Sequence, residues 1–433
     1  MGSVEWNGFL AAFLLLFFLQ NAVALWMEQL NRKRMKEEGS RIPPGFEDVL
    51  DAGKLEQIAA YSGESIRLGI AETLVTETLL LIALLSGVLP WLARLFSEDW
   101  GLSCVPAGLL FFFATGAAFA VVELPFGYYD TFVIEEKYGF NRSTPKLWII
   151  DRVKEGLATL VLSAIVLSAV LGVIATAPGS WWLWGFLAVS FVQFSLVALH
   201  PVLIAPLFNK FTPVEDEALA RKITDLLERG GIRVKTILQM DAGRRSGHTN
   251  AYFTGLGRTK RIVLYDTLLE SHPHEEVLGV LAHEAGHYRG RHVLKEVALF
   301  EVMMLGAFYL TYHLMGWEGM YSAFGFASPL PFAGLFLTGV LWQKLGFFLK
   351  PLYMALSRRF ERKADAFSVR LMGTAAPMIS SLKRLASDNL ANLTPHPLYV
   401  WFNYSHPPLV DRVSALAEAD RSASEGAGKI QEL

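Results

Sequence analysis

A short segment of the chain carries two histidines and a glutamate at the spacing of a helical metal site. It reads His283-Glu284-Ala285-Gly286-His287. Histidines four residues apart lie on one face of a helix, where their neutral imidazole nitrogens can bind a single Zn²⁺. Glu284 lies beside them, where its carboxylate can take a proton from water on the zinc. The alternative is a solvated helix with unrelated polar residues. The motif alone fits many unrelated zinc peptidases.

A catalytic zinc ion needs a third protein ligand, and three arrangements compete. An extended motif would place a third histidine at Val293, whereas the nearby histidine is His292, one residue early. An intramembrane site would need a Leu-Asp-Gly segment, which the sequence lacks. The third arrangement takes a carboxylate from a separate helix. Glu361 and Asp365 are four residues apart, so one can ligate the metal while the other hydrogen-bonds a ligand histidine. An ordinary surface helix with ion pairs is the alternative for these two acids.

The motif must lie on a helix that follows a small α/β segment. Residues Glu215–Gly230 have apolar side chains at helical spacing and end in Gly-Gly. Three short runs then read as strands: Lys235–Met240, Asn250–Gly255 and Arg261–Tyr265. Ser271–Glu276 has an early proline and acidic residues, which is typical of a helix start. We expect the helix of the motif to begin there.

The composition indicates an unusually apolar chain. Its 433 residues are 52% hydrophobic and 18% charged, with a net charge of −2 and a mean hydropathy of +0.34. Soluble chains carry roughly 25% charged residues. These values exclude a disordered chain, a basic nucleic-acid-binding domain and a small secreted scaffold. The single cysteine, Cys104, excludes an intramolecular disulfide framework. No nucleic-acid partner is expected.

The apolar residues cluster in seven stretches, each long enough to cross a bilayer. They are Gly8–Trp26, Leu68–Leu92, Cys104–Phe126, Ile149–Thr176, Trp181–Ile204, Val293–Met315 and Pro331–Leu352. Basic residues follow the first stretch and do not precede it, so we interpret it as a retained helix and not a signal peptide. Lys and Arg also gather after the third, fifth and seventh stretches. The positive-inside rule therefore predicts an N-terminus facing away from the cytosol and hydrophilic parts facing it. The last two stretches would return Glu361 to the side of His283.

Charged residues also lie in or beside these stretches. They include Glu72 and Glu77 in the second, Asp151, Lys154 and Glu155 at the start of the fourth, and Glu296 and Glu301 in the sixth. Charge within a bilayer is costly, so such residues usually face a bundle interior or a water-filled space. The alternative is that several lie at the membrane interfaces.

We expect three parts along the chain. Residues 1–208 would form an N-terminal membrane region with five transmembrane helices. Residues 209–420 would form a zinc metallopeptidase domain that includes transmembrane helices six and seven, and residues 421–433 would form a C-terminal tail.

Taken together, these features resemble the type 1 CAAX prenyl proteases, which are seven-helix integral-membrane zinc metalloproteases. The resemblance covers nearly the whole chain. It includes the zinc motif before the sixth stretch and Ser357-Arg358-x-x-Glu361-x-x-Ala364-Asp365 after the seventh. Three further segments match: Glu135–Thr144, Asn250-Ala251-Tyr252-Phe253-x-Gly255, and Ser405-His406-Pro407-Pro408 with Arg412. The resemblance implies an α-helical membrane fold, with seven helices around a water-filled chamber and a gluzincin-like α+β protease part on the cytosolic side.

The resemblance also assigns roles in catalysis. One zinc ion would be held by His283, His287 and Glu361. Glu284 would act as the general base that takes a proton from the attacking water, which zinc activates by lowering its pKa toward about 7. Asp365 would orient a ligand histidine or donate a proton.

Four further residues would contact the substrate. Asn250 and Ala251 would lie on an edge strand that pairs with an extended peptide. His406 and Arg412 would lie near the cleft, with His406 placed to stabilise the oxyanion. Without the resemblance, His406 reads as a surface residue before a Pro-Pro turn and Asn250 as a turn residue.

The resemblance implies hydrolysis near the C-terminus of prenylated Cys-a-a-X substrates, with the lipid bilayer as a second partner. Two alternatives remain open. Shorter heat-shock-induced membrane proteases share the zinc motifs and degrade misfolded proteins without prenyl specificity. A seven-helix transporter or receptor would carry the histidines incidentally. The location would be the endoplasmic reticulum membrane in a eukaryote or the inner membrane in a bacterium, with the catalytic part facing the cytosol. The oligomeric state is not predicted.

Overall fold

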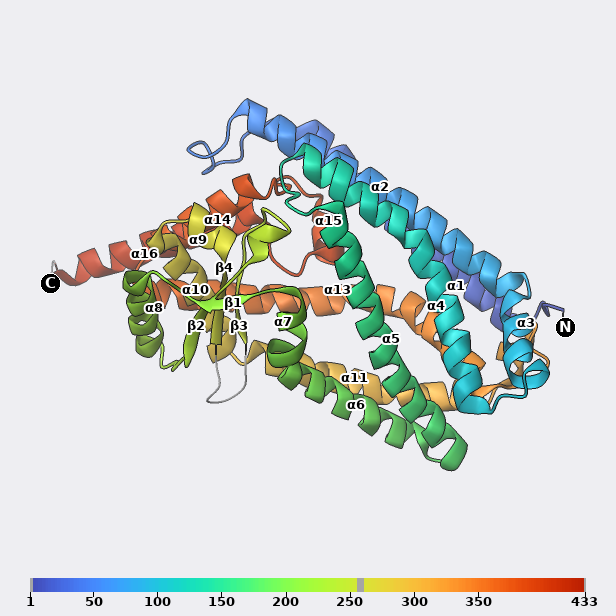
Figure 1. The fold of residues 1–433 in the computed structure, drawn as a ribbon. Helices are drawn as coiled ribbons and strands as arrows, with labels where there is room; N and C mark the ends of the chain where they lie inside the picture. Colours follow the sequence, from blue (N-terminus) through green and yellow to red (C-terminus); the bar gives the residue numbers. More distant parts are fainter. Residues whose placement is uncertain (1–2, 255–260, 432–433) are drawn as a thin grey trace.

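The computed structural model describes residues 3–254 and 261–431 (Figure 1). Seven long helices dominate the fold. They are α1 (Gly8–Glu38), α2 (Ala52–Leu85), α4 (Cys104–Tyr129), α5 (Pro145–Thr176), α6 (Trp181–Leu199), α11 (His292–Met315) and α13 (Pro331–Met372). Each contains most of one predicted membrane stretch. The expected class, an α-helical membrane protein with a small α/β protease part, is confirmed.

Six of these helices are long and apolar enough to cross a membrane, counted over the described residues. The exception is α11, whose apolar surface is interrupted by Lys295, Glu296 and Glu301. This helix nevertheless has 24 residues and packs lengthwise between α6 and α13. At about 1.5 Å per residue it is long enough to cross the roughly 30 Å hydrocarbon core alongside them.

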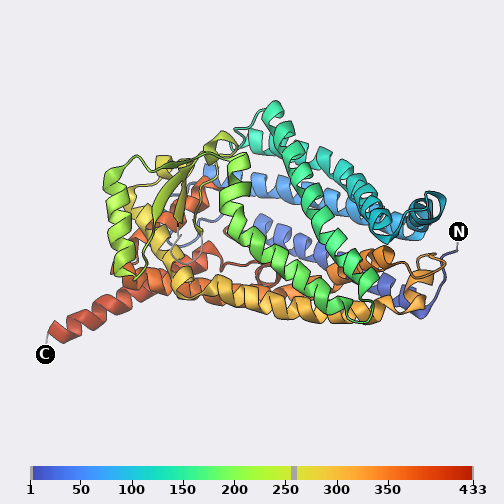
Figure 2. The ribbon, with the colours of Figure 1, turned by 60° about the horizontal axis from the view of Figure 1, so that its bottom comes forward.

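Contacts between the seven helices close into a ring. In order around the ring, α1 contacts α2, α2 contacts α4, α4 contacts α5, α5 contacts α6, α6 contacts α11, α11 contacts α13, and α13 contacts α1 again. Figure 2 shows the helices running between the protease part at one end and the loops near the N-terminus at the other. The alternating directions carry the chain back to the protease end after α1, α4, α6 and α13.

Short elements continue or connect the long helices. Three π-helical turns extend long or short helices: η1 (Leu95–Asp99) extends α3 (Val88–Arg94), η2 (Asp130–Glu135) extends α4, and η3 (His200–Ile204) extends α6. The short helix α7 (Ala205–Phe208) follows η3, and α12 (Glu318–Ser322) precedes α13. A buried apolar core at the end away from the protease part joins α1, α3, α4 and α13.

Two of the intramembrane charges are paired deep in the bundle. Lys344 of α13 donates to both carboxylate oxygens of Glu77 of α2 at 2.5 Å, and only 1% of the Lys344 side chain is exposed. Asn21 of α1 also donates to Glu77 at 3.4 Å. Elsewhere in the ring, Ser190 of α6 donates to Oε2 of Glu301 of α11 at 2.7 Å, whereas Oε1 of Glu301 is buried without a hydrogen bond from any described residue. The buried charge of Glu77 is compensated by Lys344, which makes its burial less costly.

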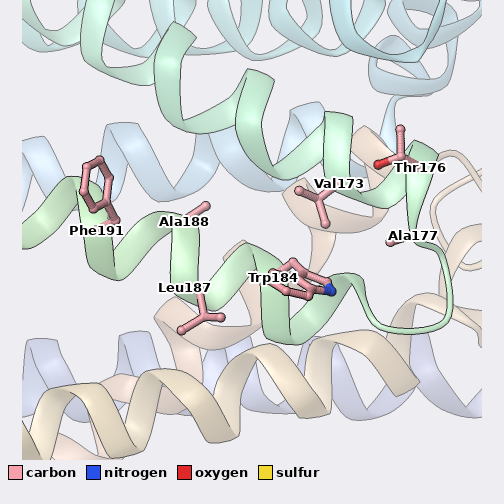
Figure 3. A pocket seen from close by; sticks show the side chains of 7 residues that line it. All are labelled: Val173, Thr176, Ala177, Trp184, Leu187, Ala188 and Phe191. Carbon is pink, nitrogen blue, oxygen red and sulfur yellow. The ribbon is translucent and has the colours of Figure 1, made fainter.

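A hollow of about 520 Å³ lies between α5 and α6 (Figure 3). Its lining is almost wholly apolar and includes Val173, Trp184 and Phe191, and both helices are predicted membrane spans. It contains none of the candidate site residues.

The protease part contains a four-stranded sheet in the order β1-β2-β4-β3. The strands are β1 (Phe211–Pro213), β2 (Thr236–Met240), β3 (Ala251–Thr254) and β4 (Arg261–Tyr265). Strands β2 and β4 pair in parallel, whereas β1 and β3 join the two edges antiparallel. The three predicted strands are confirmed, and β1 was not predicted. Pro213 is compatible with β1 because this strand lies at an edge.

Helices cover this sheet and complete the protease part. They are α8 (Glu217–Arg229), α9 (Asp266–Ser271), α10 (His274–Arg289), α14 (Ala376–Asp388), α15 (Pro397–Asn403) and α16 (Leu409–Gln431), with a 3₁₀ turn, η4 (Ala242–Arg244), before β3. The helix predicted over Glu215–Gly230 is α8, and it buries Leu219, Ile223, Leu226 and Leu227 against β4 and α10. The zinc-motif helix is α10.

Candidate metal centre

The metal site lies where α10 crosses the C-terminal half of α13. At about 1.5 Å per residue, the 42 residues of α13 reach roughly 60 Å, about twice the hydrocarbon thickness of a bilayer. The C-terminal half of α13 therefore extends beyond the membrane and carries Glu361. Gly286 permits the close crossing, because a Cβ atom there would lie 2.7 Å from the Cα of Ala364. The glycine inside the histidine motif thus brings the two ligand-bearing helices together.

The start of α10 is fixed by a buried carboxylate. Glu276 is 4% exposed and accepts hydrogen bonds from Ser380 at 2.6 Å and from Nε of Arg384 at 2.7 Å, both on α14. Burial alone would raise the pKa of Glu276, but these hydrogen bonds lower it on balance. The charged pair anchors α10 to α14 and so sets the position of the histidines two turns later.

Three ligand atoms converge at the crossing. The two Nε2 atoms of His283 and His287 are 3.2 Å apart. The carboxylate oxygens of Glu361 lie 3.3 Å from Nε2 of His283 and 3.1 Å from Nε2 of His287. Among the described residues, this is the group whose ligand atoms all lie within 4.8 Å of one another. The predicted ligand set is thus brought together, with Glu361 as its carboxylate.

The burial of Glu361 supports a metal at this point. Its side chain is only 4% exposed, and Oε2 is buried without a hydrogen bond from any described residue. Nη1 of Arg412 lies 3.8 Å from this oxygen, beyond hydrogen-bond distance, so the buried carboxylate has room for a closer cation to compensate it. Two imidazoles and one carboxylate are also a donor set that catalytic zinc sites use. The residues present therefore fit one zinc ion.

Asp365 supports His283 from behind. Its Oδ1 lies 2.8 Å from Nδ1 of His283, the ring nitrogen that faces away from the ligand cluster. A hydrogen bond from Nδ1 to this carboxylate leaves Nε2 free to bind a metal. Asp365 in turn accepts two hydrogen bonds from Arg412 of α16, at 2.6 and 2.9 Å. The predicted substrate residue Arg412 is thus buried, at 7% exposed, behind Asp365.

His292 lies on the other side of His287. The Nδ1 atoms of the two rings are 3.2 Å apart, and His292 is not one of the three converging ligands. It is the first residue of α11 and follows Arg291, whose left-handed backbone (φ 51°) makes the sharp turn out of α10. Such a conformation costs a non-glycine residue about 1–2 kcal/mol, so the turn is held by its surroundings.

Glu284 and His406 lie next to the ligands. Glu284 is half-buried, and burial raises the pKa of its carboxyl; the charges of the two ligand histidines lower it and that of Glu361 raises it. Nε2 of His406 lies 3.3 Å from Oε1 of Glu361, while Oγ of Ser405 lies 2.8 Å from its Nδ1. Loss of solvent around the ring and the charge of Arg412 lower the pKa of His406, whereas the charge of Glu361 raises it, and the pKa is lowered on balance.

The predicted substrate strand passes beside the end of α10. Strand β3 begins at Ala251 and is an edge of the sheet, paired with β4 on one side. Phe253 stacks on Tyr288, the residue after His287, with ring centroids 6.3 Å apart. Asn250 accepts a hydrogen bond from the backbone of Ala251 through its side chain, and Ala251 is 4% exposed. Gly255, the last residue of this motif, lies outside the described residues.

The loop before β3 is held by residues whose role the sequence did not reveal. Glu135, at the end of η2, accepts from Tyr61 at 2.6 Å and lies 3.3 Å from Nε2 of His248. The other ring nitrogen of His248 lies 2.7 Å from Oδ1 of Asn389, and its ring stacks on Phe140 at 4.3 Å. We call Glu135, Phe140 and His248 the loop brace. The matching segment Glu135–Thr144 was the signal, but its spacing from His248 gave no partner.

Asp151 makes a second tie to the same loop. It forms a paired contact with Arg245, at 2.8 and 3.2 Å, and is 7% exposed. Asp151 lies at the start of a predicted membrane stretch. Its charge pairs with Arg245 and so connects α5 to the loop that precedes β3.

Comparison with known proteins places these features in a family. Residues 31–210 match the family model described as CAAX prenyl protease N-terminal, five membrane helices, and residues 213–420 match that of peptidase family M48. The chain is 33% identical to a CAAX prenyl protease 1 homolog of Oryza sativa over 390 residues, covering 88% of this chain and 91% of that protein. It is also 33% identical to CAAX prenyl protease 1 of Saccharomyces cerevisiae over 419 residues, covering 89% and 90%.

A solved structure has the same fold. The crystal structure of S. mikatae Ste24p matches with a TM-score of 0.86 and 29% sequence identity, covering 96% of this chain and all of that chain. The seven-helix ring, the α/β part and the convergent ligands thus define a membrane metalloendopeptidase. The alternative of a transporter or receptor with incidental histidines is wrong. The chain belongs to the CAAX prenyl protease 1 family.

Proposed function

We propose that the protein is a zinc metalloendopeptidase that hydrolyses peptide bonds near the C-terminus of prenylated Cys-a-a-X substrates. The observation that carries the proposal is the convergence of His283, His287 and Glu361 beside Glu284. The substrate class follows from the relatives, which are named CAAX prenyl protease 1. Metal ligands and edge strand belong to residues 209–420, which we propose as the peptidase domain behind a membrane region of residues 1–208.

The side chains can divide the reaction between them. Bound Zn²⁺ supplies a Lewis acid that lowers the pKa of water and polarises the scissile carbonyl. Glu284, which lies beside the ligands and is not held by a hydrogen bond from a described residue, takes the proton of the attacking water and passes it to the leaving amine. His406, whose Nε2 lies beside the ligand Glu361, donates toward the oxygen on which charge develops. Asp365 and Arg412 keep His283 in the tautomer that binds metal.

The peptide would bind along β3. The free edge of an antiparallel strand offers backbone donors and acceptors to an extended chain, which adds to the sheet. Starting at Asn250, this edge runs toward Tyr288 and so leads to the ligands on α10. The edge strand can therefore hold a C-terminal segment in extended form at the metal.

The membrane ring gives a prenylated substrate a place beside the site. The contacts of the seven helices close on themselves, and α13 also contacts α4 across the ring; the space left between the helices would be the chamber. The location would be the endoplasmic reticulum membrane in a eukaryote or the inner membrane in a bacterium, with the catalytic part facing the cytosol.

The proposed substrate class is tested with one peptide in two forms. The purified protein is given a Cys-a-a-X peptide with farnesylated cysteine and the same peptide with a free thiol. We expect chelator-sensitive cleavage with a higher kcat/KM for the farnesylated form. Equal kcat/KM for both forms would instead support a membrane quality-control protease without prenyl specificity.

A further inference from the structure

The histidine that follows the zinc motif lies against one of its ligands. Nε2 of His287 faces the other ligand atoms, so a metal-binding His287 must carry its ring proton on Nδ1. That nitrogen lies 3.2 Å from Nδ1 of His292. A hydrogen bond between the two rings therefore requires His287 to donate and His292 to accept. His292 must then carry its own proton on Nε2.

The ring of His292 is held in place by packing from two helices. His292 is 2% exposed, and its ring lies parallel to that of Phe360, at 6° with centroids 4.2 Å apart. Phe360 is the residue before the ligand Glu361 on α13. On the other side the ring fills the space over Gly290, where a Cβ atom would collide with it. The position of the acceptor is thus fixed by Phe360 and Gly290.

We propose that His292 is the positioning residue for the ligand His287, as Asp365 is for His283. A metal-bound histidine almost always donates its second ring N–H to a carboxylate, carbonyl or water that fixes its orientation. Here the two ligand histidines would be supported differently, one by a carboxylate paired with Arg412 and the other by a neutral imidazole. The neutral acceptor adds no negative charge to a site that already holds Glu361, Asp365 and Glu284.

The same contact connects the membrane to the metal. His292 is the first residue of α11, the ring helix that also carries Glu296 and Glu301. A shift of α11 along its axis would move the acceptor away from His287. The inference rests on the proposed metal function of His287.

Three substitutions separate the hydrogen bond from the packing. His292→Phe keeps a flat ring on Phe360 but removes the acceptor, and His292→Asn returns an oxygen near the position of Nδ1. His313→Phe, at the other end of α11, is the matched control because its ring packs on Tyr309 and Tyr312, away from the ligands. The Zn²⁺ dissociation constant is measured for each by competition with a chelator, and the visible spectrum of the Co²⁺ form is recorded.

We expect His292→Phe to weaken Zn²⁺ binding on the order of 10- to 100-fold and to shift the Co²⁺ spectrum, since loss of such a partner has this effect at other sites. His292→Asn should regain most of the affinity, and His313→Phe should match the wild type. Wild-type affinity in His292→Phe would overturn the inference. An equal loss in His292→Asn and His292→Phe would also overturn it, because the effect would then follow packing.

Failure of this inference differs from failure of the proposed function. If the wild type binds no Zn²⁺ and cleaves no peptide, the proposed function is wrong. If the wild type binds Zn²⁺ and cleaves while His292→Phe does so equally well, only the role of His292 is wrong. Melting of the metal-free variants shows whether a loss of affinity reflects unfolding, in which case His292→Leu replaces His292→Phe.

Discussion

Glu284 differs from the other acids at the site in how it is held. Glu361 and Asp365 each lie within 3.3 Å of a ring nitrogen of His283. Glu284 forms no hydrogen bond or ion pair with the described residues, and burial raises its pKa. A carboxylate that is not fixed by protein partners can exchange protons with water and substrate. Glu361 and Asp365 therefore hold the ligand histidines, whereas Glu284 is placed to transfer protons.

Replacing Glu284 by Gln should therefore separate metal binding from turnover. We expect Glu284→Gln to retain the metal, because the ligand atoms of His283, His287 and Glu361 are unchanged. Its kcat should fall on the order of 10²- to 10⁴-fold, since an amide cannot accept the proton. Peptide hydrolysis and elemental analysis on the same preparation measure both quantities. Full activity would remove Glu284 from the mechanism.

The choice of the third ligand shows what the sequence could and could not predict at this scale. The spacing of His283 and His287 was sufficient to predict a metal site. Spacing could not decide between His292 and Glu361, because the turn at Arg291 and the crossing of α13 depend on tertiary packing. The structure places Glu361 with the ligands and His292 against the outer nitrogen of His287.

At the scale of elements, the crossing of α10 and α13 determines whether the ligands meet. Gly286 faces the backbone of Ala364, and no side chain larger than hydrogen fits between them. Hydropathy predicted the long helices, and short strand-like runs between turns predicted three strands. The crossing itself was not predicted, and neither were β1 and α15. Strand β1 has only three residues, and α15 is held by distant contacts such as those of Arg358 with the carbonyls of Val400 and Tyr404.

Gly286→Ala should push the two helices apart. The added methyl group would overpack the crossing, which typically costs about 1–3 kcal/mol in the free energy of unfolding. The melting temperature and the metal content should both fall. Gly339→Ala on α13, the other helix of the crossing, is the control, because nothing lies within 4 Å of its Cβ position. Equal effects of the two substitutions would show that the close crossing does not matter.

The loop brace should make the loop before β3 sensitive to pH. The contact with Glu135 raises the pKa of His248, and Asn389 and the ring of Phe140 are its other neighbours. A raised pKa in the folded state means that the stabilisation is full below the unfolded pKa of about 6.5 and is lost as the pH rises through the folded value.

His248→Phe keeps the stacking on Phe140 and removes the titrating group. The melting temperature of the wild type should exceed that of the variant most at about pH 5.5, and this difference should shrink toward about pH 9. The KM for peptide should rise in the variant, since the brace holds the segment leading to the edge strand. A difference in melting temperature that is constant over this range would contradict the contribution of the charged pair.

At the scale of the whole molecule, the ring of seven helices puts the protease part at one end and the N-terminus at the other (Figure 1). The sequence predicted this arrangement, because the last two membrane stretches form a hairpin that returns Glu361 to the side of His283. The charges inside the bundle were less predictable. The pairing of Glu77 with Lys344 joins helices far apart in the sequence.

The orientation can be tested by cysteine labelling, because the chain has a single native cysteine that is easily removed. In a Cys104→Ala background, Gly179→Cys places a thiol in the loop between α5 and α6, and Glu217→Cys places one on α8 of the protease part. An impermeant maleimide applied to sealed vesicles should label position 217 from the cytosolic side and position 179 from the opposite side. Labelling of both positions from one side would contradict the predicted topology.

His283, His287 and Glu361 are proposed to hold a catalytic metal ion, and measuring metal content together with cleavage shows whether they do. Wild type and Glu361→Ala are purified in parallel, and metal per chain and hydrolysis of a farnesylated peptide are measured on each. We expect one zinc ion per chain in the wild type. Chelation should remove zinc and cleavage together, Zn²⁺ should restore both, and Glu361→Ala should have neither zinc nor cleavage. Equal zinc in Glu361→Ala and wild type, or cleavage by metal-free protein, would contradict this proposal.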